Sequence, residues 1–262
     1  MKIIDSHCHL NISPLAEQID KIITEANALG VQEFIVPGII ASQWEELLVL
    51  GRKHLGIYCA AGLHPLFLEH HQKSDLITLE QLCQQNLLVA IGEIGLDFYN
   101  GKQNEQKQQQ LFEQQLGIAR KAGLPIILHV RKAHDQVLAI LRRKKFTCGG
   151  AVHAFNGSRQ QAEHYIGLGF AIGIGGAITY ERATKLRATA TRLPEESIVL
   201  ETDSPDMLIA GKVKGPNLPE YLIEILHVLS QLRQTTPEQL GRATLVNTHR
   251  VFNIKQKNDP NL

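Results

Sequence analysis

Two histidines stand at positions 7 and 9, just after the first short apolar run of the chain, Ile3-Ile4. Side chains alternate between the two faces of an extended strand, so His7 and His9 are expected to point the same way and Cys8 the opposite way. Two imidazoles on one face can bind one metal ion. A His-x-His pair also arises by chance, so its meaning depends on what the rest of the chain places beside it.

Other polar side chains follow apolar runs in the same manner. They are Glu93, His129, His153 and the pair Glu201 and Asp203. The carboxyl ends of all strands in a parallel barrel lie on one face, and that face holds the active site. Metal-competent groups that follow five separate runs are therefore expected to converge. The predicted metal ligands are His7, His9, Glu93, His129, His153 and Asp203.

The donor types indicate the kind of metal. Four imidazoles, two carboxylates and no thiolate suit Zn²⁺, Mn²⁺, Co²⁺ or Fe²⁺, and the wide cysteine spacing excludes a thiolate-rich structural zinc site. Six donors are too many for one catalytic ion that keeps an open position, so two ions are predicted. Glu93 has two oxygens and is the candidate bridge between them. Two ions about 3.5–4 Å apart form a clamp for hydrolysis at phosphorus or at a carbonyl carbon.

The elements that must position these residues are short apolar runs with few internal charges, as in strands buried on both faces. Eight are predicted, at residues 3–4, 34–36, 57–61, 87–91, 125–128, 151–152, 170–174 and 198–200. An amphipathic helix is predicted between two of them at 104–122. Capping-box patterns at Ser158 and Thr236 predict the starts of two more helices.

Strands that alternate with helices over about 200 residues predict a parallel α/β fold. An open doubly wound sheet fits this alternation as well as a closed barrel does. Eight strands without a visible domain break favour a single-domain, TIM-like (β/α)8 barrel. The hydrolase barrel is expected to span residues 1–254, followed by a polar tail at 255–262.

The composition sets further bounds. With 262 residues, 44% of them hydrophobic and 20% charged, the chain is globular and not disordered. A net charge of +1 excludes a strong overall field that attracts polyanions. No apolar run reaches the ~18 residues of a membrane span, and Asp5 interrupts any signal-peptide core. Four widely spaced cysteines indicate free thiols in a reducing compartment. We therefore expect a cytoplasmic protein without membrane association or an obligate protein partner.

Several motifs in register resemble the TatD family of metal-dependent hydrolases, part of the amidohydrolase superfamily. The motifs are DSHCHL at 5–10, GLHP at 62–65, GEIGLD at 92–97, His129, VHAFNG at 152–157 and LETDSP at 200–205. The resemblance runs from residue 3 to about 254. It departs after the eighth strand, where the family often carries Arg-Gly-Lys-Arg-Asn-Glu-Pro. This chain has GKVKGPNLP at 211–219, which keeps the Asn and the Pro but has fewer basic residues.

The resemblance implies a TIM-like barrel with two divalent cations, of Zn, Mn, Mg, Co or Fe. It implies that one cation is held by His7, His9, Glu93 and Asp203, and the other by Glu93, His129 and His153. It also implies deoxyribonuclease activity, commonly the release of nucleotides from a 3′ end. The expected partner is a nucleic acid or a small phosphodiester substrate.

The residues suggest roles in such a reaction. Divalent cations lower the pKa of water toward neutrality. Asp203 is the expected general base that later returns the proton to the leaving oxygen, and Glu93 is expected to be essential for turnover. His64 is a candidate substrate contact, although it could equally be a loop histidine bonded to backbone. Arg131 shares the parity of His129 and is a candidate phosphate clamp, with an ordinary surface arginine as the alternative.

Three other features have two interpretations, and a fourth has one. Asp5 is expected on the same strand face as His7, where it either orients an imidazole or caps a buried backbone group. Glu201 is expected on the same face as Asp203, as a deeper carboxylate behind the ligands. Asp97 is expected in a loop after Glu93, where it caps backbone or contacts substrate. Gly173, Gly175 and Gly176, at and just beyond the end of the seventh strand, either seat a phosphate or allow tight packing beneath the metals.

Two other functions compete with a two-metal phosphodiesterase. A mononuclear zinc deaminase or carbonyl (amide or ester) hydrolase on the same barrel also uses His-x-His and an Asp after the eighth strand, and the number of bound metals separates the two. Glu93 favours the two-metal enzyme, because other superfamily branches often use a carboxylated lysine there. The third possibility is a non-catalytic metal-dependent binding protein. Coordination positions left open to water argue against it.

Overall fold

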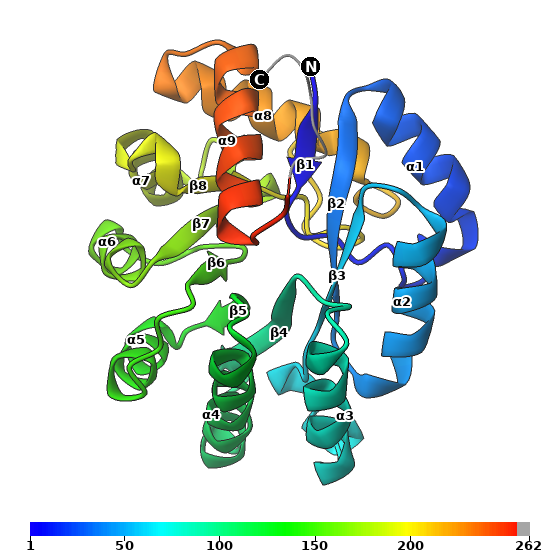
Figure 1. Cartoon of the computed structure of the whole chain (residues 1–262). Helices are drawn as coiled ribbons and strands as arrows, with labels where there is room; N and C mark the ends of the chain where they lie inside the picture. Colours follow the sequence, from blue (N-terminus) through cyan, green and yellow to red (C-terminus); the bar gives the residue numbers. More distant parts are fainter. Residues whose placement is uncertain (256–262) are drawn as a thin grey trace.

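The computed structural model describes residues 1–255, in which strands and helices alternate along the chain (Figure 1). The strands are β1 (Ile3–Asp5), β2 (Val31–Gly38), β3 (Ile57–Ala61), β4 (Ala90–Asp97), β5 (Ile126–Arg131), β6 (Gly150–Val152), β7 (Phe170–Ile174) and β8 (Ile198–Leu200). The helices are α1 (Ile19–Ala28), α2 (Trp44–Lys53), α3 (Lys73–Gln84), α4 (Glu105–Ala122), α5 (His134–Arg143), α6 (Arg159–Gly167), α7 (Thr184–Arg192), α8 (Leu222–Arg233) and α9 (Pro237–Val251).

The strands form one sheet in the order β1 to β8, and every neighbouring pair is parallel. The sheet curls so that its last strand meets its first, because the backbone N–H of Ser6 donates to the carbonyl of Leu200 over 2.9 Å. The same seam continues outward, where the N–H of Asp203 donates to the carbonyl of His7 over 2.9 Å. The predicted TIM-like barrel is confirmed, and the open sheet is excluded.

All eight predicted strands are present, but the fourth was misplaced. It was predicted at 87–91, whereas β4 begins at Ala90 and continues to Asp97. Glu93 therefore lies inside the strand, and Asp97 ends it instead of lying in a loop. The prediction failed because Gly92, Glu93 and Gly95 interrupt the apolar run. The extra length pairs with β5, whose Arg131 lies opposite Asp97.

Local sequence accounts for the helix ends. Ser158 and Thr236 form the predicted capping boxes of α6 and α9, each accepting from the backbone N–H three residues later. Helix α4 ends at Ala122, and Gly123 follows it with a left-handed φ of 67°. Glycine adopts this conformation at little energetic cost because it has no Cβ. The buried face of α4 carries Phe112 and Leu116 toward the sheet. Helices α1 to α8 surround the strand ring, whereas Leu245 and Val251 of α9 pack against the side chains inside it (Figure 1).

One layer of side chains fills the barrel below the polar residues. Every strand contributes one: Ile4, Ile35, Ala60, Ala90, Ile127, Ala151, Ala171 and Val199. Four of the eight are alanines, which leave space inside the ring. Phe252 and Ile254, just beyond α9, pack against this layer. The last segment of the described chain therefore contributes to the barrel core.

The cysteines and the chain end complete the description. All four cysteines are free thiols, and Cys8 is buried in the helix-facing core, as its parity predicted. Among residues 1–255, we find no helix that is both long and apolar enough to cross a membrane. The polar tail predicted at 255–262 lies, beyond Lys255, outside the described residues.

Candidate metal centre

The six predicted ligands come together at the carboxyl ends of the strands. His7 and His9 follow β1, Glu93 lies in β4, and His129 lies in β5. The other two, His153 and Asp203, follow β6 and β8. Mutually close donor atoms occur in three sets, within 4.8 Å in each: His7, His153 and Asp203; His7, His9 and Glu93; His64, Glu93 and His129. Their role as ligands stays a prediction.

Glu93 lies at the centre of this cluster, and its two oxygens face different histidines. Its Oε2 lies 3.3 Å from Nε2 of His7 and 3.6 Å from Nε2 of His9. Its Oε1 lies 2.8 Å from Nδ1 of His129 and 2.9 Å from Nε2 of His153. The carboxylate therefore separates two sets of imidazoles, one on each oxygen.

Asp203 lies close to both His7 and His9. Its Oδ1 lies 3.5 Å from Nε2 of His7 and 3.7 Å from Nε2 of His9. Its backbone φ of 59° lies in the left-handed region, which costs a non-glycine residue energy and is common at functional sites. Its side chain keeps 13% exposure, so solvent reaches this carboxylate.

Hydrogen bonds on the side away from the cluster determine which ring nitrogen of His9 and of His129 faces it. Nδ1 of His9 lies 3.2 Å from the carbonyl of Pro37 and donates to it, which leaves Nε2 as the lone-pair atom. Nε2 of His129 lies 2.8 Å from Oδ2 of Asp97 and donates to it, which leaves Nδ1 free for the cluster. Such backing bonds orient metal-binding imidazoles and raise their basicity.

The charges of the cluster create a strongly negative site. Burial lowers the pKa of His153, but the carboxylates of Glu93 and Asp203 more than offset this and raise it to about 10. Burial and the neighbouring His153 hold the pKa of His7 well below its usual value, so that ring is neutral. Burial opposes ionisation of Glu93, yet the surrounding histidines hold its pKa well below the usual range. The negative field that keeps a proton on the buried His153 also favours the binding of a metal cation at the cluster.

Two deeper carboxylates adjoin the cluster. Asp5 accepts from the backbone N–H groups of His7 and Thr202, over 3.2 and 3.0 Å, so it caps backbone as one of its two interpretations required. Glu201 accepts from the N–H of Ala154, and its Oε1 lies 3.8 Å from Nδ1 of His153. Burial raises the pKa of Asp5 to about 7 and that of Glu201 to about 8.

Gly173 has a packing role. A Cβ at this position would overlap the carboxylate of Glu201. The glycine therefore makes room for the buried carboxyl group of Glu201 beneath the cluster, which supports tight packing over the phosphate-seat alternative.

His64 joins the cluster beside Glu93. Its Nδ1 accepts from the N–H of Leu66 over 3.2 Å, and its Nε2 lies 3.5 Å from Oε1 of Glu93. Burial and the neighbouring His129 lower its pKa to about 4, so the ring is neutral at pH 7 and carries its proton on Nε2. His64 is thus bonded to backbone, and it also presents an N–H donor at the site; its contact with substrate stays a prediction.

Arg131 does not join the cluster. Its side chain is exposed, and its guanidinium carbon lies 3.6 Å from the ring centroid of Tyr99. It lines a neighbouring cleft instead.

Sequence reasoning missed two positioning groups. Asp97 was assigned to a loop and not recognised as the partner of His129. Asn217 was noted only as a retained motif residue, but it is fully buried and anchors the loop after β8. Its Nδ2 donates to the carbonyl of Thr202 over 2.7 Å and to that of Met207 over 3.3 Å. The signal for both was their place inside rare motifs.

The cluster fits divalent cations. Asp5, Glu93 and Glu201 are buried and Asp203 is half-buried beside them, and over residues 1–255 no lysine or arginine nitrogen lies within 4.0 Å of their oxygens. Buried charges need compensation. Nδ1 of His7 and Nδ1 of His153 have no hydrogen-bond partner within the described chain. Imidazole and carboxylate donors without thiolates suit borderline or hard divalent metals.

Comparisons with known proteins agree with this chemistry. The model of a family described as TatD related DNase matches residues 4–253. A protein of Escherichia coli K12 named "Uncharacterized metal-dependent hydrolase YjjV" is 39% identical, over 97% of this chain and 98% of its own length. The crystal structure of that TatD homologue superimposes with a TM-score of 0.93 and the same coverage.

Another relative has a more specific name. A protein of Erwinia billingiae named "3'-5' ssDNA/RNA exonuclease TatD" is 32% identical, over 95% of this chain and 98% of its own length. An organophosphorus hydrolase variant from Deinococcus radiodurans has a TM-score of 0.65 at 15% identity and shares the fold alone. With its barrel, its cluster of metal donors and a family match over nearly its whole length, this chain belongs to the TatD family and is a metal-dependent hydrolase.

Proposed function

We propose that this hydrolase cleaves phosphodiester bonds of nucleic acid with two divalent cations. The two oxygens of Glu93 carry the proposal, because they face different imidazoles: Oε2 faces His7 and His9, and the nearest imidazole nitrogens to Oε1 are those of His129 and His153. One cation is assigned to His7, His9, Glu93 and Asp203, and the other to Glu93, His129 and His153. When bound, the cations supply Lewis-acid stabilisation of the phosphate charge and lower the pKa of nearby water.

Asp203 is the proposed general base. Its side chain is 13% exposed, against 3% for Glu93, so solvent reaches it more readily, and its partial burial raises its pKa, which makes it a better proton acceptor. The attacking water gives its proton to Asp203 while its oxygen forms a bond to phosphorus. The bond from phosphorus to the leaving oxygen breaks, and the proton passes from Asp203 to that oxygen.

His64 and Glu93 have the supporting roles. The Nε2–H of His64 points at the site from a neutral ring and is the proposed donor to a phosphate oxygen. Glu93 stays anionic and spaces the two donor sets. The name of the Erwinia billingiae relative supports single-stranded nucleic acid as the substrate and attack from the 3′ end.

Hydrolysis of labelled single-stranded DNA tests the proposal. The protein loaded with Mg²⁺ or Mn²⁺ is expected to release nucleotides from the 3′ end, and a chelator is expected to stop release. Glu93→Gln should lower kcat by at least about 100-fold. Glu69→Gln, an exposed carboxylate, is the matched control and should keep wild-type activity.

Two results would contradict the proposal. One is the absence of chelator-sensitive cleavage of any phosphodiester, and the other is full activity of Glu93→Gln. Hydrolysis of amides or carboxyl esters with a single tightly held zinc would indicate the mononuclear enzyme instead.

A further inference from the structure

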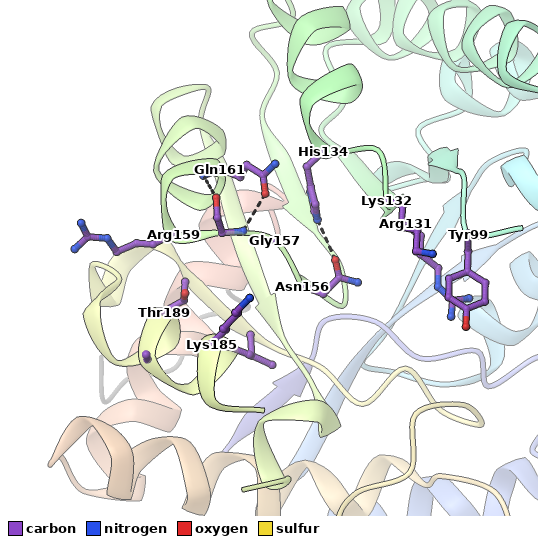
Figure 2. A pocket seen from close by; sticks show the side chains of 13 residues that line it. Tyr99, Arg131, Lys132, His134, Asn156, Gly157, Arg159, Gln161, Lys185 and Thr189 are labelled. Carbon is purple, nitrogen blue, oxygen red and sulfur yellow. Dashed lines mark hydrogen bonds between the residues drawn. The ribbon is translucent and has the colours of Figure 1, made fainter. Parts of the chain in front are cut away.

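A cleft of about 790 Å³ adjoins the metal centre. It begins where the cluster ends, since Arg131 follows His129 by two residues and Asn156 follows His153 by three. Two strand residues correspond to about 7 Å of backbone. The cleft is lined by Tyr99, Arg131, Lys132, His134, Asn156, Gly157, Ser158, Arg159, Gln161, Lys185, Leu186, Ala188 and Thr189, most of which are labelled in Figure 2.

The lining is cationic. It contains Arg131, Lys132, Arg159 and Lys185 but no Asp or Glu. Arg159 is paired, with its Nε 3.4 Å from Glu163. Within residues 1–255, the other three cations have no carboxylate oxygen within 4.0 Å. The cleft therefore carries unneutralised positive charge, although the whole chain is nearly neutral.

One wall of the cleft is built around an exposed aromatic ring. Tyr99 is 50% exposed, and the guanidinium carbon of Arg131 lies 3.6 Å from its ring centroid. Nζ of Lys132 lies 4.6 Å from the same ring centroid. The backbone of Lys132 has a left-handed φ of 53°. Cation–π contacts hold both charges at the edge of the cleft. Figure 2 shows this wall facing Lys185 of α7 across the cleft.

The floor of the cleft offers a polar donor. Oδ1 of Asn156 lies 3.1 Å from Nε2 of His134, so the amide oxygen is occupied as an acceptor and Nδ2 remains available to donate. Figure 2 places Asn156 between Arg131 and Lys185. Arg131, Lys132 and Lys185 supply positive charge and Asn156 supplies an N–H donor. This combination suits a phosphate, which is anionic and accepts hydrogen bonds.

We propose that this cleft binds the sugar-phosphate backbone of single-stranded nucleic acid whose terminal linkage lies at the metal centre. The inference rests on the proposed function and extends it, because it requires a substrate with several phosphates. Grooves for single strands combine cations that follow the backbone with aromatic rings on which bases stack. Arg131, Lys132 and Lys185 contact phosphates, and Tyr99 positions Arg131.

Binding measurements test the cleft without relying on catalysis. The probe is a fluorescein-labelled phosphorothioate octathymidylate, which keeps one negative charge at each linkage, measured by anisotropy with the metal-loaded full-length chain over a series of salt concentrations. In Lys132→Gln/Lys185→Gln, we expect the slope of log K against log salt to shrink by about 1.4, at about 0.7 for each lost contact. Affinity near 0.1 M salt should fall by about 10-fold or more.

Matched variants and competitors decide the outcome. Lys107→Gln removes one exposed charge on α4 and should leave both slope and affinity unchanged. Tyr99→Ala should weaken binding, and Tyr99→Phe should restore it because the ring is retained. An unchanged slope in the double variant would overturn the proposal. Equal competition by an octaglutamate peptide would also overturn it, because the cleft would then bind any polyanion. Cleavage of phosphodiesters is measured separately, so failure of the proposed function leaves this result interpretable.

Discussion

Asp97 and His129 form a hydrogen-bonded pair in which Oδ2 of the buried carboxylate lies 2.8 Å from Nε2 of the half-buried ring. The other nitrogen of the same ring, Nδ1, lies 2.8 Å from Glu93. Burial opposes ionisation of Asp97, but the hydrogen bonds from His129 and from the backbone N–H of Tyr99, with the charges of His129 and Arg131, together outweigh it and lower the pKa of the carboxyl. An anionic Asp97 thus holds the ring proton on the far side and leaves Nδ1 facing the metal centre.

Replacing Asp97 tests this relationship. Asp97→Asn keeps the shape but removes the charge that makes His129 more basic, so the affinity for Mn²⁺ should fall by about 10-fold or more. Calorimetric titration of the metal-free chain measures it. The control is Asp20→Asn, an exposed carboxylate outside the barrel, which should not change affinity. Equal affinities for wild type and Asp97→Asn would show that the pair does not support metal binding.

His64 offers a test of substrate contact. His64→Leu removes the Nε2–H donor, and kcat/KM for single-stranded DNA should fall by about 100-fold. His64→Gln retains an N–H group and should recover part of the loss. His70→Gln alters an exposed histidine of the following segment and serves as control. If His64→Leu kept wild-type kcat/KM, His64 would act only as a backbone cap.

Gly173 tests the packing beneath the cluster. Gly173→Ala places a methyl group against the Glu201 carboxylate and should lower the free energy of unfolding by about 1–3 kcal/mol. Gly167→Ala is the matched control, because nothing lies within 4 Å of its added Cβ and it is the last residue of α6. It should be neutral or stabilise the protein by up to about 1 kcal/mol. Urea unfolding measures the free energy of unfolding of both variants. If Gly173→Ala were as stable as wild type, the packing role of Gly173 would be refuted.

A buried charge pair far from the metal centre gives a pH-dependent prediction. Glu33 in β2 contacts Nε2 of His249 and lies 2.7 Å from Nζ of Lys2. Burial raises the pKa of Glu33, but the hydrogen bonds from His249 and Lys2 outweigh it and lower the pKa below 4.5. The ionised carboxylate therefore stabilises the fold above that pH, and its contribution is lost as pH falls through the lowered pKa.

Urea unfolding of Glu33→Gln checks the sign. The variant should be less stable than wild type by about 1–3 kcal/mol at neutral pH, and the difference should shrink as pH drops below 4.5. Glu25→Gln, an exposed carboxylate on α1, should change stability by less than about 0.5 kcal/mol. A difference that stays constant down to acid pH would mean that the carboxylate charge contributes nothing.

The sequence predicted most of this structure because its strands are uniform apolar runs and its polar residues follow those runs directly. His129 and His153 were found in this way, as was the pair His7 and His9. The method failed in β4, where glycines and Glu93 interrupt the run, so Asp97 was assigned to a loop. It also could not show that Arg131 turns to Tyr99, because parity along a strand does not determine the direction of a long side chain beyond the strand end.

Some features depend on tertiary contacts that no local pattern encodes. Asn217 stands in a motif, but its anchoring role follows only from the carbonyls it binds, which belong to Thr202 and Met207. The cationic cleft gathers residues from β5, α6 and α7 that are dispersed among other charged positions in the sequence. Its positive charge follows from its lining, which contains four basic residues and no Asp or Glu, and this grouping exists only in the folded chain.

The number of divalent cations bound by each chain shows whether Glu93 joins two metal sites. Elemental analysis of the purified, metal-saturated protein should give about two cations per chain, and Glu93→Gln should give at most one, because the carboxylate shared by both donor sets is lost. A single cation in the wild-type protein, retained unchanged in Glu93→Gln, would mean that the cluster is not a two-metal centre.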